Sequence, residues 1–199
     1  LRDITGVIQL TLLKKKLGDE NFKSWANINR ESIILVRGIV KENKEAPGGV
    51  EMLPDNIELM NEAETPLPLG VIDKIDSEIE TRLNARYLDL RKTEIAANFQ
   101  IRAAISGAVH KHLRRENFLE VQTPKIIASA TEGGTSLFEM KYFDKTAYLA
   151  QSPQLYKQIL MGGGLERVYE VGPAFRAEEH NTPRHLNEFI SIDIEMSFA

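Results

Sequence analysis

An arginine at position 176 ends one apolar run of this sequence, and the pair Arg184-His185 comes just before the next. A polar loop separates the two basic groups. A guanidinium offers five N–H donors in a planar fork, which matches the oxygens of phosphate and carboxylate groups. The arrangement therefore indicates a clamp for a nucleotide triphosphate.

A second group of polar residues follows a predicted helix start. Ser152 is typical of an N-cap, Pro153 of the first helical position, and Gly162 of a helix end. Gln154 and Lys157, three positions apart, then share one face of the first turn, where the helix dipole favours anions. This pair predicts a site for a carboxylate ligand.

Acidic residues supply the complementary charges. Asp193 and Glu195 alternate with apolar residues, so they share one face of a predicted strand, and Asp193 is the candidate partner for a substrate ammonium. Glu132 precedes two glycines in a loop that could close on the same ammonium. His110 and His112 lie two positions apart on a predicted helix and point in different directions, which argues against a metal site.

The elements that must position these groups are predicted from periodicity. Residues 168–175 and 189–198 are expected to form an antiparallel strand pair. A long amphipathic helix is expected from 94 to 116, with an apolar stripe, and a strand ended by Pro124 follows it. The stripe consists of Ile101, Ile105, Val109 and Leu113.

The first part of the sequence predicts a small β domain. Extended runs at 7–12, 33–40, 50–52 and 57–59, with a turn at 46–49, indicate a small barrel. Phe22 and Trp25 lie between the strands, where core packing is favoured over base stacking. Residues 62–69 contain two prolines and predict an extended connector between domains.

Composition sets the wider limits. The 199 residues carry a net charge of -4 and no cysteine, so neither a disulfide framework nor a thiolate nucleophile is available. No apolar run approaches the roughly 20 residues of a membrane span, and no signal-peptide pattern opens the chain. A soluble, cytoplasmic protein is expected, and the lack of an initial methionine indicates a fragment.

Four segments resemble the class II aminoacyl-tRNA synthetases. Residues 172–189, with Phe-Arg-Ala-Glu-Glu-His-Asn-Thr-Pro-Arg-His-Leu-Asn-Glu, resemble motif 2 of the aspartyl enzymes of the archaeal and eukaryotic type. Arg-Tyr-Leu-Asp-Leu-Arg at 86–91 is similar to a signature of the aspartyl, asparaginyl and lysyl subgroup. The predicted helix, strand and Pro124 resemble motif 1, and residues 152–157 are similar to the aspartate-binding helix.

The resemblance implies an α+β fold with three parts. Residues 1–61 would be an incomplete OB-like barrel that binds the anticodon, and residues 62–93 a hinge. Residues 94–199 would be the first part of the catalytic domain, an antiparallel sheet flanked by helices. Motif 1 implies a homodimer.

The resemblance also implies ligation of L-aspartate to tRNA through an adenylate, with ATP as substrate and Mg²⁺ assisting. Motif 3 and the Mg²⁺ ligands would lie beyond Ala199, so this chain alone is expected to be inactive. Arg176 would be the catalytic residue and contact both substrates. The implied aspartate-binding residues are Glu132, Gln154, Leu155, Tyr156, Lys157, Arg176 and Asp193, and the implied ATP-binding residues are Arg176, Ala177, Glu178, Arg184, His185 and Leu186.

Three alternatives stay open. The first is an asparaginyl enzyme of the same subgroup, or an aspartyl enzyme that also charges the tRNA for asparagine. The second is a synthetase-like enzyme that makes asparagine from ammonia through the same adenylate. The third is a non-catalytic binding module that kept the fold.

Overall fold

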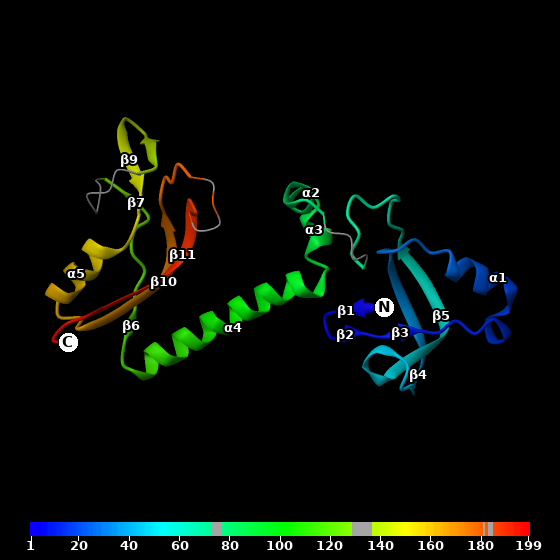
Figure 1. Ribbon diagram of the computed structural model, residues 1–199. Helices are drawn as coiled ribbons and strands as arrows, with labels where there is room; N and C mark the ends of the chain where they lie inside the picture. Colours follow the sequence, from blue (N-terminus) through cyan, green and yellow to red (C-terminus); the bar gives the residue numbers. More distant parts are fainter. Residues whose placement is uncertain (73–76, 129–136, 181, 183–184) are drawn as a thin grey trace. The chain divides into compact units, whose positions relative to one another are not determined.

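The chain folds into two compact units, Leu1–Arg91 and Lys92–Ala199, each a mixture of helices and short sheets (Figure 1). The computed structural model describes residues 1–72, 77–128, 137–180, 182 and 185–199. Glu132 and Arg184, both predicted site residues, lie outside the described residues. The α+β class expected from the sequence is confirmed.

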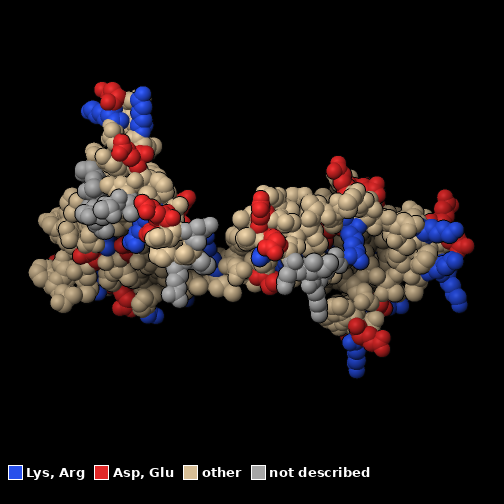
Figure 2. Space-filling view, turned by 45° about the horizontal axis from the view of Figure 1, so that its top comes forward, with Lys and Arg blue, Asp and Glu red and all other residues tan. Residues whose placement is uncertain are grey.

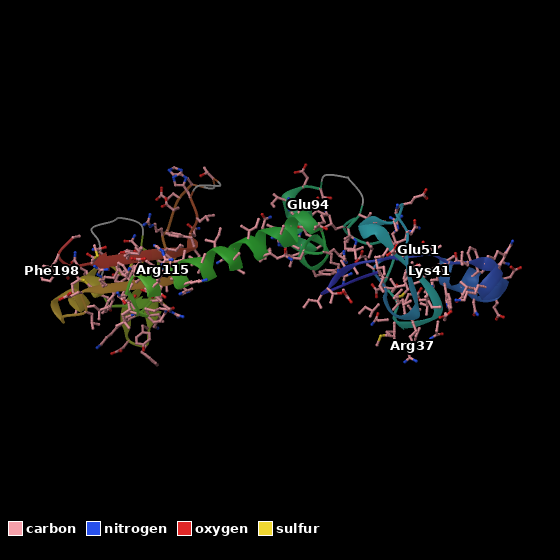
Figure 3. All side chains as sticks on the ribbon, turned by 90° about the horizontal axis from the view of Figure 1, so that it is seen from below. Arg37, Lys41, Glu51, Glu94, Arg115 and Phe198 are labelled. Atoms are coloured by element: carbon pink, nitrogen blue, oxygen red, sulfur yellow. The ribbon has the colours of Figure 1, made fainter. Side chains whose placement is uncertain are left out.

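The first unit is built on a long β-hairpin. Strands β4 (Ile33–Glu42) and β5 (Val50–Asn61) pair antiparallel, and Figure 3 labels one opposed pair, Lys41 and Glu51. The short strand β3 (Gln9–Leu10) pairs parallel with β5 and completes a three-stranded sheet. The predicted turn is a 3₁₀ turn at Pro47–Gly49, in which Gly48 and Gly49 have φ of 77° and 76°.

Two features of this sheet differ from the prediction. The runs 50–52 and 57–59 belong to one continuous strand, because Pro54 sits beside a register shift opposite Gly38, where a proline is tolerated. A Cβ on Gly38 would lie 2.3 Å from the carbonyl oxygen of Leu53. The second difference concerns closure of the sheet. Strands β1 (Arg2–Asp3) and β2 (Gly6–Val7) form a separate two-stranded sheet, and the sheets of the described residues are open, so a closed barrel is not confirmed.

Helix α1 (Lys14–Ala26) was not predicted, because Gly18 breaks its periodicity at a φ of 76°. Phe22 and Trp25 are half-buried on this helix. Lys14 lies 3.1 Å from Asp19, and Lys16 forms an ion pair with Asp55.

The proline-containing segment after β5 packs onto two short helices, α2 (Ile79–Asn84) and α3 (Arg86–Asp89). Its Leu69 joins Ala85 and Leu88 in a small buried cluster. This cluster lies within residues 62–93, the segment that the sequence predicts as a linker or hinge.

The second unit begins with α4 (Thr93–Arg115), whose two ends are marked by Glu94 and Arg115 in Figure 3. The predicted stripe is only partly covered. Leu113 is 6% exposed, whereas Ile101 and Ile105 are 57% and 54% exposed.

Two small sheets follow. Strands β10 (Arg167–Phe175) and β11 (Glu188–Met196) form the predicted antiparallel pair, and β6 (Leu119–Glu120) adds to β10 in parallel. This sheet is therefore mixed rather than antiparallel. The second sheet is antiparallel, with β9 (Lys145–Leu149) between β7 (Ile126–Ile127) and β8 (Glu139–Tyr142).

Helix α5 (Gln154–Gly162) lies beside β10 and β11 (Figure 1). It begins one residue later than predicted, and the hydroxyl of Ser152 accepts a hydrogen bond from the Gln154 N–H. At its end, the N–H of Leu165 donates to the carbonyl of Leu160, while Gly164 adopts a φ of 88°. This is a Schellman ending, in which Gly164, the last residue of the glycine run predicted to cap the helix, supplies the left-handed conformation.

Charged residues of both signs are intermixed over the face shown in Figure 2. Among the described residues, no helix is long and apolar enough to cross a membrane.

Candidate active site

The β10–β11 hairpin sorts its side chains onto two faces. Residues opposite one another in this pair include Glu170 with Asp193 and Val168 with Glu195. Since alternate residues share a face, all three carboxylates project from the same side of the hairpin. The other face of β11 carries a row of half-exposed apolar residues: Ile190, Ile192, Ile194 and Met196.

Helix α5 places Lys157 against the acidic face. The Lys157 side chain is 4% exposed, and its Nζ lies 3.3 Å from Asp193 Oδ1 and 3.4 Å from Glu195 Oε2. Nζ also donates to the carbonyl oxygen of Ile194 at 3.4 Å. A buried ammonium requires such partners, so Lys157 is fixed at the centre of the acidic group.

Gln154 lies one turn before Lys157 and reaches the same strand. Its Nε2 donates to Glu195 Oε2 at 3.4 Å. The structure thus brings together Gln154, Lys157 and Asp193, as the sequence predicted, with Glu195 between them. Leu155 is 44% exposed and Tyr156 is half-buried on the same helix turn.

Arg176 comes directly after the last residue of β10. Its N–H donates to the carbonyl of Asn187, which closes the strand pair, and its guanidinium lies 5.3 Å from the centre of the Phe189 ring. Phe189 shares the face of β11 that carries Asp193 and Glu195. The arginine side chain is therefore held on the same face as Lys157, by a cation–π contact.

The loop after Arg176 is tied back to the hairpin. The N–H of Glu178 donates to Oδ1 of Asn187 at 3.0 Å, and Ala177 is half-buried beside it. His185 Nδ1 lies 2.6 Å from the Thr182 hydroxyl, and the His185 ring meets His180 edge-on. Leu186 is 53% exposed.

Three residues near the site were not singled out by the sequence. Glu170 is 1% exposed, accepts hydrogen bonds from the N–H and hydroxyl of Thr123, and lies 2.7 Å from Lys125 Nζ. The carboxylate leans over Gly172, where an added Cβ would lie 3.1 Å from Glu170 Oε1. Glu170 lies six positions before Arg176, and this even spacing could have placed both on one face of the strand. The residues that pair with Glu170, however, lie far upstream in the sequence.

The opposite face of β10 carries a second polar cluster. The fully buried Tyr169 donates to Glu120 at 3.1 Å, and its hydroxyl lies 2.9 Å from His110 Nδ1. Arg114 binds the same carboxylate at 2.6 Å and, as the main cause, holds the pKa of Glu120 below its usual range. Burial raises the pKa of Tyr169. This cluster ties α4 to the sheet.

The charged and polar groups of the site are suited to binding a small charged ligand. Within the described part of the chain, no group of three or more histidine or acidic residues is placed to hold a metal ion. The site instead offers a buried ammonium, an amide, a strand-end guanidinium and paired carboxylates. Such a set can hold a small zwitterion next to a phosphate.

Comparison with known proteins identifies relatives of this chain. Residues 78–199 match the family described as tRNA synthetases class II (D, K and N). The aspartate–tRNA(Asp/Asn) ligase of Methanopyrus kandleri is 58% identical over 198 residues, which cover 100% of this chain and 46% of that protein. The aspartate–tRNA(Asp) ligase of Picrophilus torridus is 54% identical over 199 residues, 100% of this chain and 47% of its own.

Solved structures of aminoacyl-tRNA synthetases also match this chain. Asparaginyl-tRNA synthetase from Pyrococcus horikoshii, complexed with asparaginyl-adenylate, superposes with a TM-score of 0.90 at 34% identity, covering 100% of this chain and 45% of that chain. Aspartyl tRNA synthetase from Entamoeba histolytica gives 0.77 at 32% identity, with 95% and 41% covered. The chain spans about half the length of the curated relatives it matches.

Proposed function

We propose that this chain, which belongs to the class II tRNA synthetases of the D, K and N group, carries the amino-acid site of an aspartate–tRNA ligase. The observation that carries the proposal is the buried Lys157, held on one face of the hairpin with Gln154, Asp193 and Arg176. Curated relatives 51–58% identical over essentially the whole chain are named aspartate–tRNA ligases, which supports it.

The proposed reaction has two steps and needs no enzymatic nucleophile. The α-carboxylate of aspartate attacks the α-phosphorus of ATP, the bond to pyrophosphate breaks, and aspartyl-adenylate forms. A terminal ribose hydroxyl of the tRNA then attacks the aspartyl carbonyl, and AMP leaves. The protein's task is to orient the reactants and to stabilise the charge that develops on the α-phosphate.

Roles follow from charge and position. Lys157 and Gln154 would bind the side-chain carboxylate, with Leu155 and Tyr156 on the same helix turn, and Asp193 would bind the ammonium. Glu132 would meet the ammonium from its loop. Arg176 would bridge the aspartate carboxylate and the α-phosphate, and the remaining ATP contacts are assigned to Ala177, Glu178, Arg184, His185 and Leu186.

Mg²⁺ is proposed to enter with ATP and to neutralise its phosphates. The described residues do not form a carboxylate group fit to hold it. No step is therefore assigned to the ion in this part of the protein.

The outer parts of the chain are assigned to macromolecular partners. Residues 1–61 are proposed to be the later strands of an OB-type domain that binds the tRNA anticodon, supported by exposed apolar side chains on β4 such as Ile33 and Ile39. Residues 62–93 are the proposed hinge, and residues 94–199 part of the catalytic domain. The exposed residues of α4 support a homodimer, as argued below.

Replacement of Arg176 by alanine tests the assignment. In the full-length protein, Arg176→Ala is expected to abolish aspartate-dependent ATP–pyrophosphate exchange, a loss on the order of 1000-fold, because the α-phosphate loses its main cation. The matched control is Arg102→Ala on α4, far from the hairpin along the chain. Near-normal exchange by the Arg176 variant would contradict the proposed role.

A second candidate function concerns the tRNA. Some of the relatives are named for both tRNA(Asp) and tRNA(Asn), others for tRNA(Asp) alone. Charging of tRNA(Asn) with aspartate would assign the broader activity. Exchange driven by asparagine would indicate an asparaginyl enzyme, ammonia-dependent asparagine formation an amide-forming one, and no exchange at all a binding module.

A further inference from the structure

Thr123 and Lys125, both half-buried, form a polar cluster with the buried Glu170 that the proposed reaction does not use. Glu170 Oε1 lies 3.1 Å from the Thr123 N–H and 2.7 Å from Lys125 Nζ, and Oε2 accepts the Thr123 hydroxyl at 2.7 Å. Lys125 Nζ also donates to that hydroxyl at 3.0 Å. The cluster joins the segment before β7 to the middle of β10.

Burial makes the pairing within this cluster obligatory. The Glu170 side chain is 2% exposed and that of Lys125 is 22% exposed. A carboxylate removed from water is stable only when hydrogen bonds and a counter-charge replace its hydration. Thr123 and Lys125 provide both from one short segment, so each depends on the other's position.

The cluster adjoins the acidic group through the register of the hairpin. Glu170 and Asp193 are opposite residues of β10 and β11, and like charges in such pairs repel. Lys125 engages Glu170, while Lys157 engages Asp193 and Glu195. The three carboxylates are thus divided between two ammonium groups.

We infer that Lys125 and Glu170 are positioning residues for the amino-acid site. By neutralising Glu170, Lys125 leaves Lys157 to Asp193 and Glu195, which fixes the ammonium of Lys157 and the carboxylate of Asp193 where a zwitterionic amino acid is to bind. The inference rests on the proposed function, because it assigns Lys157 and Asp193 to that ligand. Neither Lys125 nor Glu170 needs to touch the ligand.

Loss of Lys125 alone should disturb this division of charge. Glu170 would then be a buried carboxylate without a cation, and Lys157, which pairs with the opposed Asp193, lies on the same face of the hairpin. Drawing Lys157 toward Glu170 releases Asp193. Removing both charges together should leave Lys157 with its original partners.

The test is a charge-paired set of variants in the full-length protein, assayed by ATP–pyrophosphate exchange. Lys125→Met is expected to raise the KM for aspartate about tenfold, with the KM for ATP changed less than about threefold. The double variant Lys125→Met/Glu170→Gln is expected to return the KM for aspartate to within about threefold of the native value. Lys125→Arg, which keeps the charge, should behave as the native protein does.

The inference is overturned if Lys125→Met leaves the KM for aspartate unchanged, or if the double variant is impaired as much as the single one. A purely structural role would lower the melting temperature and affect both substrates alike, which also contradicts it. If Lys125→Met does not fold, Glu170→Gln takes its place in the test. Lys125, left without its carboxylate, should then compete with Lys157 for Asp193 and raise the KM for aspartate severalfold. An unchanged KM for aspartate in this variant would contradict the inference. Absence of aspartate-dependent exchange in the native protein would instead refute the proposed function.

Discussion

The Lys157 side chain is buried, and burial of an ammonium without a partner costs free energy. Two carboxylates and a backbone carbonyl lie within 3.4 Å of its Nζ, and the side chain is almost fully buried. Its position is therefore set by electrostatics as much as by the helix that carries it. A ligand carboxylate that enters the site meets a cation whose geometry is already fixed.

Lys157→Met keeps the length of the side chain and removes its charge. In the full-length protein, the KM for aspartate is expected to rise on the order of 100-fold, since Asp193 and Glu195 are left without their cation. Exchange kinetics with varied aspartate measure the effect. Lys145→Met, in the exposed β8–β9 hairpin, is the control, and equal effects of the two substitutions would argue against the assigned role.

At the level of elements, the stability of α5 depends on the backbone conformation at its C-terminal end. Gly164 adopts a φ of 88° with open space around its Cα, so an alanine there is strained without being crowded. Gly164→Ala is expected to destabilise the protein by about 1 kcal/mol. Gly162→Ala, two residues earlier and also in open space, has no positive φ and should be neutral or stabilising. Thermal melts of the two variants separate the backbone conformation from the added methyl group, and equal melting temperatures would contradict the argument.

The link between α4, β6 and β10 is expected to be sensitive to acid. Hydrogen bonds from Arg114 and Tyr169 hold the pKa of Glu120 below its ordinary value of 4.5. A carboxyl with a lowered pKa in the folded state stabilises the protein above its unfolded pKa, and this contribution is lost as the pH falls through the folded value.

Glu120→Gln should therefore lower the melting temperature at pH 7, and the difference from the native protein should shrink below about pH 4. Melts recorded from pH 3 to pH 7 provide the measurement. Glu139→Gln, on the exposed strand β8, controls for the substitution itself. A difference that stays constant over this range would show that ionisation of Glu120 is not the cause.

Elements with strong local signals were predictable. The helix grammar around Ser152 and Pro153, the periodicity of α4 and the paired runs of β10 and β11 all correspond to observed elements. Helix α1 was missed because Gly18 interrupts it, and β5 was divided because Pro54 is normally a strand breaker. In both cases tertiary context overrides the local preference.

The candidate site was predictable where residues act from one element or from neighbouring strands. Gln154, Lys157 and Asp193 meet as expected because helix and strand periods place them on facing sides. Glu170 was not recognised, since its partners Thr123 and Lys125 lie 47 and 45 positions upstream in sequence. Only the folded chain reveals that this carboxylate is buried and paired.

For the whole molecule, the exposed apolar side chains of α4 concern the oligomeric state. Ile101 and Ile105, one turn apart on the same side of α4, are 57% and 54% exposed, and the end of this helix is anchored to the sheet by Leu113 and His110. Apolar side chains in such a row favour a covering partner. The family resemblance of this region makes a second copy of the chain the proposed partner.

Ile105→Glu tests the homodimer. A charge buried at the interface is expected to raise the dimer dissociation constant at least about 30-fold, whereas Ala103→Glu, on another side of α4, should have a smaller effect. Sedimentation velocity of the full-length protein over a range of concentrations measures the change. A monomeric native protein, or a dimer insensitive to Ile105→Glu, would exclude this face as the interface.

The contact between Glu170 and Gly172 also constrains the order in which the sequence can change. A side chain at position 172 would press on the Glu170 carboxylate, so an alanine there is tolerated best after position 170 has become shorter. Shortening position 170 first, however, leaves Lys125 without its counter-charge. Positions 125, 170 and 172 are therefore expected to change together in evolution. Single substitutions at them are disfavoured, whereas paired substitutions are tolerated.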